Sequence, residues 1–273
     1  MAARPESRPL SFQLGLLHAA DGSAQVAAGA SVTQAATAAA PVCLPPLFLT
    51  CGLVLCLCPG NTVVFASVVG PRGLPARKDV GGATRAQLEV TWRPEEDPSA
   101  PPLSRDRASL ALQVSGALNS VFMASTQPRT GTHITVQVRR DDGSLLAAAL
   151  NAACAAACDA GVPLTHLLGA ACVALDARGG VVVDPTAAEE AAAACVLTCA
   201  FKLPPSPAGD GGASHGAGDE DDQEEVVLSH ISKGSCSVEQ LVAAVAACRA
   251  ASHTQVVQAL RRAVEGSHAR HAA

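Results

Sequence analysis

Hydrophobic and polar residues alternate along several short segments of this chain, which is the pattern of β-strands with one buried face. Other segments repeat apolar residues at the spacing of an amphipathic helix. The expected strands are residues 60–71, 86–92, 132–138, 168–175, 180–184, 195–203 and 226–232. The expected helices are residues 108–123, residues 146–160, and a long helix after Ser237 that breaks near Ser252. The chain is therefore expected to combine sheets with helices.

Capping residues indicate where some of these helices begin and end. Ser237, with Gln240 three residues later, has the spacing of an N-terminal capping box. The alanine-rich helix at 146–160 is stopped by Gly161-Val162-Pro163. The segment 189–193 is so rich in alanine that the pattern assigns it to no element.

One apolar run, residues 42–58 (VCLPPLFLTCGLVLCLC), brings a membrane into consideration. Its length is at the short limit for a helix that spans a bilayer. Pro45-Pro46 would break the first turn of such a helix, and no Lys or Arg flanks it. We therefore expect no membrane span, and a membrane-anchored protein is the weakest of the alternatives.

Composition limits the classes of function that fit the chain. With 273 residues, of which 49% are hydrophobic and 16% charged, it can form one large domain or two small ones. Only 2% of the residues are aromatic, so stacking on nucleic-acid bases is not expected to be its main contact. The net charge of −5 argues against a general phosphate-binding surface. Any contact with nucleic acid must therefore be local.

The eleven cysteines are an odd number and include no CxxC motif. Two pairs, Cys154/Cys158 and Cys195/Cys199, lie among apolar residues at helical spacing. We expect small buried thiols in a reducing compartment, with metal or disulfide roles as the alternative.

Three short motifs carry a resemblance to a known family: Ala20-Asp21-Gly22-Ser23-Ala24, Asp141-Asp142-Gly143-Ser144-Leu145-Leu146, and the segment from Asp184 to Glu190 (DPTAAEE). Together they resemble the RNase PH family and, within it, the ring subunits of the eukaryotic RNA exosome. The resemblance implies an α+β class, with the RNase PH fold (ribosomal protein S5 domain 2-like) and a mixed sheet packed against helices. It places the domain at residues 10–265 and leaves 266–273 as a flexible tail.

The resemblance also indicates an insertion. Without residues 30–59, the segment ADGSAQVAA would run almost directly into GNTVVFASVVGPRG, and the joined text is similar to the opening hairpin of the family. Residues 30–59 are therefore expected to be either a lineage-specific loop or an error in the gene model. Residues 206–225 are rich in Gly and Ser and then in acidic residues, which predicts a disordered loop. We interpret its acidic cluster as a solvated spacer, with a metal site as the alternative.

The family's phosphate-binding motif, Gly-Thr-Arg, falls on Gly143-Ser144-Leu145, so Leu145 occupies the position of the arginine. A leucine side chain cannot bind phosphate. A second family arginine falls near Gly116. The two family carboxylates fall on Asp184 and Glu190, although Asp184 could instead only open an Asp-Pro turn and Glu190 only occupy an exposed helix start. The resemblance thus implies a degenerate phosphorolytic site.

The resemblance implies a non-catalytic structural and RNA-guiding subunit of the exosome, a 3′–5′ exoribonuclease complex that acts in rRNA processing and RNA decay. The implied partners are other RNase PH-like ring subunits, S1/KH cap subunits and single-stranded RNA, with no cofactor and no membrane. The alternative is a residual metal-dependent 3′–5′ exoribonuclease in which Asp184 and Glu190, with Asp142, hold Mg²⁺.

Two groups of cations are the candidate RNA contacts. The loop after Gly-Pro-Arg in related subunits faces the channel, which selects Arg72, Arg77 and Lys78, and Arg139 and Arg140 precede the degenerate site. The alternative for each is an ordinary solvated cation. Residues 1–9 are charged and no apolar core follows them directly, so we expect no secretory signal. The expected location is the nucleus, including the nucleolus, and the cytoplasm.

Overall fold

The computed structural model describes residues 12–14, 23–26, 62–73, 84–93, 107–176, 179–203 and 225–256. Several predictions fall outside these ranges. They are the insertion at 30–59 with its apolar run at 42–58, the acidic loop at 206–225 except Glu225, the tail at 266–273, and the cations Arg77 and Lys78. They stay predictions.

The described strands form two sheets. The first has the order β1-β2-β3-β5-β4 and the second the order β7-β6-β8-β9. The strands are β1 (Phe12–Leu14), β2 (Ser23–Val26), β3 (Val63–Gly73), β4 (Gln87–Arg93), β5 (Thr130–Arg140), β6 (Leu167–Leu175), β7 (Val181–Val183), β8 (Cys195–Leu203) and β9 (Val226–Gly234). The helices are α2 (Arg107–Val121), α3 (Leu145–Asp159), α4 (Ala187–Ala192), α5 (Val238–Ala251) and the π-helical turn η1 (Ser252–Val256).

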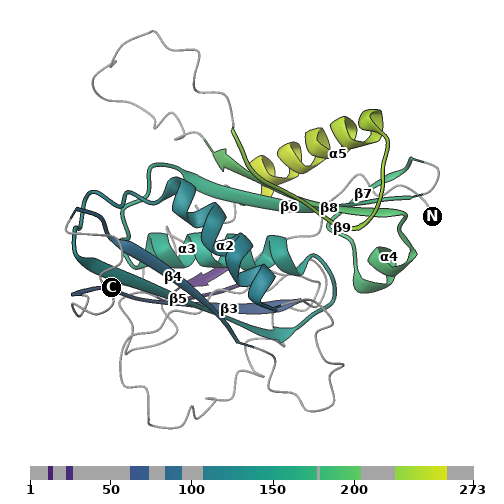
Figure 1. Cartoon of the computed structure of the whole chain (residues 1–273). Helices are drawn as coiled ribbons and strands as arrows, with labels where there is room; N and C mark the ends of the chain where they lie inside the picture. Colours follow the sequence, from purple (N-terminus) through teal and green to yellow (C-terminus); the bar gives the residue numbers. More distant parts are fainter. Residues whose placement is uncertain are drawn as a thin grey trace, which may run out of the picture.

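These elements stack in layers (Figure 1). Helix α3 lies between the two sheets, where it contacts β3 and β6, and α2 packs beside it against β4. Helix α5 covers the other face of the second sheet. The first sheet is mixed because β4 runs parallel to β5 while its other pairs are antiparallel. The α+β class and the mixed sheet are therefore confirmed, and the second, antiparallel sheet is an addition to the prediction.

The main core is built on α3, in which 13 of 15 residues are buried. Most of these residues are alanines, whose small side chains allow the helix to approach both sheets closely. A second core, between the second sheet and α5, consists of Leu, Val, Ala, Cys and Phe201. The two cores thus contain few aromatic side chains.

Side chains of α3 also complete the hydrogen bonding of β6. Strand β7 pairs only with residues 173–175 of β6, and no other described strand pairs with the same edge of β6 further toward its start. The side chain of Asn151 forms the hydrogen bonds that a neighbouring strand would form. Its amide donates to the Ala170 carbonyl and accepts from the Ala170 N–H, both at 2.7 Å. The thiol of Cys154 accepts from the Leu168 N–H at 3.2 Å. These contacts fix how α3 is placed along the second sheet.

Most expected elements agree with the structure. The expected strand at 195–203 coincides with β8, and the capping box is present, since Ser237 and Gln240 bond each other's backbone N–H. The α-helix ends at Ala251, next to the expected break. Strand β2 pairs with β3 through Ser23 and Ser67, as the resemblance to the opening hairpin of the family implied.

Two elements are missing from the sequence-based assignment, namely β1 and α4. Helix α4 begins with its own capping box, in which Thr186 and Glu189 bond each other's backbone N–H. In the part of the chain that the structure describes, no helix is both long and apolar enough to cross a membrane.

Candidate functional site

The loop between β5 and α3 is clamped by a side chain from the start of β3. The hydroxyl of Thr62 donates to the Gly143 carbonyl and accepts from the Asp142 N–H, both at 2.8 Å. Asp141 adds an acceptor for the Gly143 N–H at 3.1 Å. Thr62 is completely buried, so the turn is anchored from inside the protein.

The two acidic motifs lie in backbone contact although about forty residues separate them. The N–H of Ala187 donates to the Asp142 carbonyl at 2.8 Å. Gly143 has a φ of 99°, and a Cβ at this position would lie 2.5 Å from the Pro185 carbonyl oxygen. Only glycine allows the two segments to come this close. The structure therefore brings together the two motifs that the sequence analysis combined into one site.

Ser144 forms the N-cap of α3 in a left-handed conformation, with φ 53°. Its backbone N–H donates to Glu190 Oε1 at 2.6 Å, and its hydroxyl donates to the Pro185 carbonyl at 3.2 Å. Both residues are buried, with 1% of Ser144 and 8% of Glu190 exposed. The positive end of the α3 dipole favours an anion at the N-terminus of this helix, and the Glu190 carboxylate occupies that position.

Leu145 is the first residue of α3, and none of its surface is exposed. Its side chain belongs to the main core. A cation at this position would lose its hydration inside an apolar core. Gly116, where the second family arginine would fall, is exposed on α2, with no atom within 4 Å of a Cβ built there.

Both carboxylates are buried, which corrects one reading of the sequence. Glu190 does not occupy an exposed helix start, because it is the fourth residue of α4 and only 8% of it is exposed. Asp184, with φ 52°, follows β7 and is 5% exposed, and its N–H donates to the Cys172 carbonyl at 2.9 Å. Burial, then the negative charge of Glu190 and more weakly that of Asp184, raise the pKa of the Cys172 thiol to about 12.

One oxygen of the carboxylates assigned to Mg²⁺ under the alternative already accepts a hydrogen bond. Mg²⁺ requires near-octahedral oxygen coordination, and one Glu190 oxygen already accepts the Ser144 N–H. Among the described residues, no three His, Cys, Asp or Glu side chains are arranged to hold a metal ion. Asp142 is half-buried in the clamped turn.

Lys233, on β9 of the second sheet, binds the end of α4, a contact that the sequence analysis missed. Its ammonium donates to the carbonyls of Glu190 and Ala191, at 3.1 and 2.6 Å. A cation near the last carbonyls of a helix is favourable for the helix dipole. Strand β9 thereby fixes the helix that presents Glu190.

Arg72, the described member of the first predicted group of RNA-binding cations, does not lie beside Arg139 and Arg140. Arg72, near the end of β3, pairs with Gly131, whereas Arg140, at the end of β5, pairs with Val63 at the start of β3. Nine residues of strand separate these positions, or about 30 Å. Arg72, Arg139 and Arg140 are all exposed.

The end of β5 carries a further cation that the sequence analysis missed. Arg93 is exposed at the end of β4, and in the parallel register it pairs with Gln137, two residues before Arg139. The two arginines therefore share one face of the sheet. A strand at 86–92 was expected, but the parallel pairing of β4 with β5 depends on contacts distant in sequence.

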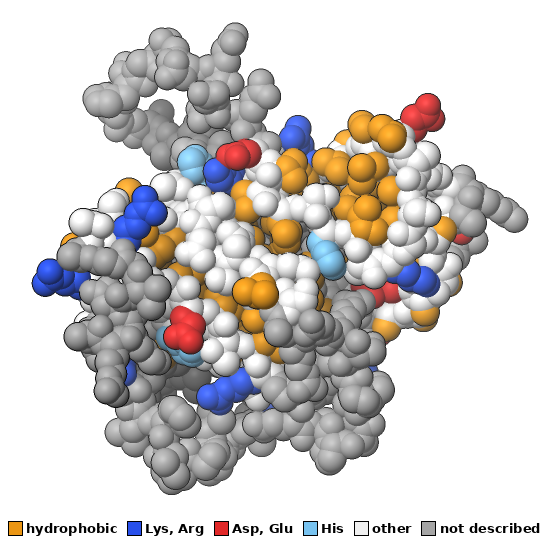
Figure 2. Space-filling view, in the orientation of Figure 1, with side chains coloured by type: hydrophobic (Ala, Val, Ile, Leu, Met, Phe, Trp, Pro, Cys, Tyr) orange, Lys and Arg blue, Asp and Glu red, His pale blue; other side chains and the backbone are white. Residues whose placement is uncertain are grey.

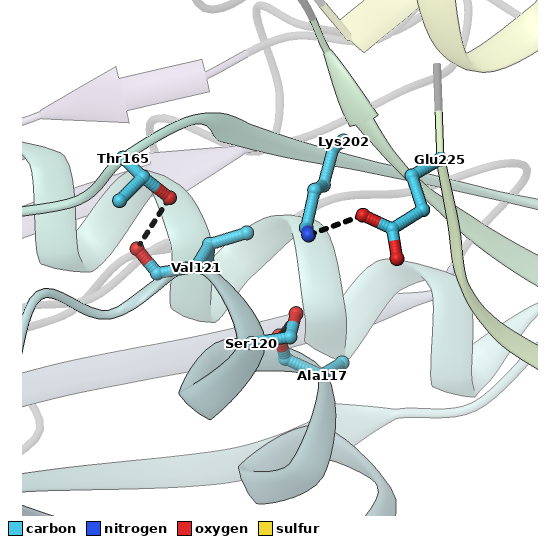
Figure 3. Close-up of polar contacts among 6 residues, drawn as sticks. All are labelled: Ala117, Ser120, Val121, Thr165, Lys202 and Glu225. Atoms are coloured by element: carbon cyan, nitrogen blue, oxygen red, sulfur yellow. Dashed lines mark hydrogen bonds and ion pairs between the residues drawn. The ribbon is translucent and has the colours of Figure 1, made fainter. Parts of the chain in front are cut away.

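Other polar contacts hold the frame around α2 and β8 (Figure 3). The ammonium of Lys202 pairs with the carboxylate of Glu225, which lowers the pKa of Glu225. The hydroxyl of Thr165 donates to the Val121 carbonyl at 3.1 Å and that of Ser120 to the Ala117 carbonyl at 2.7 Å. The Thr165 contact joins the end of α2 to the segment before β6, the Ser120 contact lies within the last turns of α2, and the Lys202 contact joins β8 to the segment before β9.

Comparison with known proteins gives a consistent result. Residues 6–163 match the family described as the 3′ exoribonuclease family, domain 1. The "Exosome complex exonuclease RRP46 homolog" of Arabidopsis thaliana is 36% identical over 131 residues, which cover 48% of this chain and 52% of that protein. The "Exosome complex component RRP41" of Homo sapiens is 33% identical over 159 residues, which cover 54% of this chain and 61% of that protein.

Solved structures extend the similarity of fold to almost the whole chain. The crystal structure of Rrp46 from rice (Oryza sativa) gives a TM-score of 0.67 at 24% identity, over 94% of this chain and 95% of that one. An exosome structure from Archaeoglobus fulgidus with RNA bound to its active site gives a TM-score of 0.61 at 17% identity. The match covers 91% of this chain and 87% of that one. In sequence, the chain spans about half the length of the curated RRP46 relatives that it matches.

Proposed function

Because this chain belongs to the RNase PH family of 3′ exoribonucleases, we propose that it is a non-catalytic structural and RNA-guiding ring subunit of an exosome complex. The similarity to RRP46 and RRP41 proteins from several organisms supports the exosome as its setting. Of these, the plant RRP46 homologues are the more similar, with 36% and 34% identity against 33% for the human RRP41.

The contact between Ser144 and Glu190, together with the burial of Leu145, carries the proposal. Phosphorolysis requires the site to bind inorganic phosphate, which needs cations or free N–H donors. Here a leucine fills the position of the family arginine and lies completely in the core. The Ser144 N–H, which could contact a bound anion, donates to the chain's own carboxylate. The site is thus better suited to support the fold than to bind phosphate.

The RNA contact that we propose is local and cationic. Arg139 and Arg140, joined by Arg93, give the end of β5 a group of exposed positive side chains on a chain whose net charge is −5. Arg72, with Arg77 and Lys78, would form a second contact at the other end of β3. Separate contacts of this kind suit an extended single strand that passes along a subunit.

The remaining parts of the proposal follow from the setting. The partners would be other RNase PH-like ring subunits, the S1/KH cap subunits and single-stranded RNA, in rRNA processing and RNA decay. The location would be the nucleus, including the nucleolus, and the cytoplasm. A structural role of this kind needs no cofactor and no membrane.

A nuclease assay tests the non-catalytic role. The purified chain and its assembled ring are incubated with single-stranded RNA and Mg²⁺, with or without inorganic phosphate. We expect no degradation from the chain alone under either condition. Release of nucleoside diphosphates that depends on phosphate would overturn the interpretation of Leu145. Release of nucleoside monophosphates that depends only on the metal would favour hydrolysis at Asp184 and Glu190.

Affinity purification tests the exosome setting independently. We expect the tagged chain to recover other ring subunits and the cap subunits, as identified by mass spectrometry. Recovery of the chain without any ring subunit would overturn the assignment to the complex, whatever the outcome of the nuclease assay.

A further inference from the structure

The first sheet has two faces, and the described helices pack against only one of them. Helices α2 and α3 contact β3, β4 and β5 from the side of the main core, where side chains such as Val64, Trp92 and Val136 are buried (Figure 1). The alternate residues of these strands point to the opposite, outer face. In the described part of the chain these outer residues are half-buried or exposed, so they take no part in the core.

The strand registers arrange the outer residues in rows, with β5 in the middle. Each row holds one residue of β3, one of β5 and one of β4, and the rows are Phe65-Gln137-Arg93, Ser67-Thr135-Thr91 and Val69-His133-Glu89. Among these nine residues Glu89 is the only acid, and its Oε2 lies 3.7 Å from His133 Nδ1. The centre of the outer face is therefore mostly polar and carries little negative charge that would repel a polyanion.

Three exposed arginines from three neighbouring strands lie at one end of this face. Arg72 of β3 and Gln87 of β4 both pair with Gly131 of β5, which places no side chain between them. Arg85 and Arg129 each precede these paired positions by two residues, at the starts of the parallel strands β4 and β5. Lys and Arg side chains gather at the left of Figure 2, where these strands begin in Figure 1.

A hydrogen-bond donor at this end has no acceptor. Nε2 of Gln87 is buried and bonds to no group among the described residues. A buried donor without an acceptor is unfavourable, and such groups are rare in folded proteins. An anionic oxygen held by the neighbouring arginines could accept from this amide. The end of the face around Gly131 therefore combines positive charge with an unused donor.

The other end of the face carries Arg93, Arg139 and Arg140, all exposed. Strand β5 separates the two ends by about 30 Å, from Gly131 to Arg140. The acidic residue that follows Arg140 is engaged in the clamped turn, since Asp141 accepts from the Gly143 N–H. The outer face of the first sheet is thus a polar surface with a group of arginines at each end.

We infer that this outer face is a platform for single-stranded RNA, which runs along β5 from one group of arginines to the other. The inference rests on the proposed RNA-guiding role and names the surface that performs it. Guanidinium groups at both ends bind phosphates. Between them Phe65 provides a ring on which one base stacks, and the polar side chains of β5 bond to sugars and bases.

A single strand fits this arrangement better than a duplex. A base can stack on Phe65 only when it is free of its own neighbours, and a duplex keeps its bases stacked and paired. The arginines at the two ends can hold one extended strand along the length of β5. Related sheet-based platforms bind about 4–16 nucleotides per fold. Local binding of this kind also agrees with a chain whose net charge is −5.

Photocrosslinking locates the bound strand. The full-length chain is irradiated with single-stranded RNA that contains 4-thiouridine and is then digested with trypsin. Cleavage after Arg129 and Arg139 releases residues 130–139, the centre of the platform. We expect crosslinks in this peptide, at His133, Thr135 or Gln137. Crosslinks that spare this peptide and lie on α5 would overturn the inference.

Titration of labelled RNA with variants of the full-length chain separates charge from stacking. Arg85→Gln/Arg129→Gln should reduce the slope of log K against log salt by about 1.4, because each phosphate contact with a single strand contributes about 0.7. Phe65→Leu should weaken binding by about fivefold or more with the slope unchanged, because stacking releases no counterions. Phe65→Tyr keeps a ring and should bind like the wild type.

The control is Arg249→Gln on α5, which should change neither the slope nor the affinity. Circular dichroism and thermal melting verify that each variant is folded. An unchanged slope in Arg85→Gln/Arg129→Gln, an unchanged affinity in Phe65→Leu, or no binding by the wild-type chain at low salt would refute the platform, even if the chain is recovered with ring subunits. RNA bound on this face of a chain that recovers no ring subunit would support the platform and refute only the exosome setting.

Discussion

Ser144 and Glu190 are 46 residues apart in sequence, yet the backbone N–H of the first donates to the carboxylate of the second at 2.6 Å. The bond joins the first turn of α3, the helix at the centre of the fold, to α4 on the second sheet. It also directs a buried negative charge at the positive end of the α3 dipole. Glu190, which the sequence analysis matched to a family carboxylate, thus acts here as an internal anion for the helix.

Replacing Glu190 by Ala should lower the free energy of unfolding by about 1–3 kcal/mol, because the Ser144 N–H would stay buried without its acceptor. Glu190→Gln should lower the free energy of unfolding by less, since the amide oxygen can still accept the Ser144 N–H. Urea denaturation measures both. The control is Glu89→Gln, whose exposed carboxylate pairs only with His133 among the described ion pairs, and we expect a change within about 0.5 kcal/mol. Equal stability of all three variants would contradict this role of Glu190.

Restoring the family arginine by Leu145→Arg should destabilise the chain by roughly 3–5 kcal/mol rather than create phosphate binding, because the charge would be buried without a partner. The matched control is Leu112→Arg, also on a helix but at a residue that is 72% exposed, which should change stability by no more than about 0.5 kcal/mol. Thermal unfolding with and without phosphate measures both. A stable Leu145→Arg protein that melts higher with phosphate would show that the site can be regained by one substitution.

Sequence patterns succeeded where the information is local. The strand at 195–203 and the capping box at Ser237 depend on alternation and on two side chains three residues apart, and both agree with the structure. Helix α4 depends on the same kind of signal, since Thr186 and Glu189 have the capping spacing, but alanines in the segment conceal any hydrophobic periodicity. This signal was present and was not used.

The remaining features depend on contacts between distant segments. The sequence indicated that Leu145, Asp184 and Glu190 belong to one degenerate site, but not that Glu190 is buried and bonded to Ser144. Burial is set by how α4 docks on the second sheet, which Lys233 on β9 helps to fix. The parallel pairing of β4 with β5 likewise has no local signature.

Asn151 should tolerate no apolar replacement. In Asn151→Ala, the N–H and the carbonyl of Ala170 both lose their side-chain partner at a strand edge that β7 does not reach, at a cost of about 1–3 kcal/mol for each unpaired group. The control Asn119→Ala removes an exposed bond from α2 to its own turn and should stay within about 0.5 kcal/mol of wild type. Denaturation in urea measures the difference. A similar cost at both positions would mean that Asn151 does not replace a strand partner.

Cys172 should make the fold sensitive to alkali. Its pKa rises from 9.0 to about 12 on folding, through burial and then through the charges of Glu190 and Asp184. The neutral thiol is therefore favoured in the folded state. Its contribution is complete below pH 9 and is lost as the pH rises from 9 toward 12, because the unfolded chain ionises first. Cys172→Ala should lose less stability than wild type between pH 8 and about 11. Parallel curves for the two proteins would contradict the shift.

RNA binding by the assembled ring should depend on salt through the arginines at the end of β5. Each cation that contacts a phosphate of single-stranded RNA contributes about 0.7 to the slope of log K against log salt, so Arg139→Gln/Arg140→Gln should reduce the slope by about 1.4. Affinity should fall similarly for different sequences, because these contacts reach the backbone and not the bases. Arg249→Gln is the control. Arg249 is on α5, away from the first sheet, and its side chain lies over the ring of Phe201 on β8. An unchanged slope in the double variant, or the same reduction in the control, would exclude the end of β5 as an RNA contact.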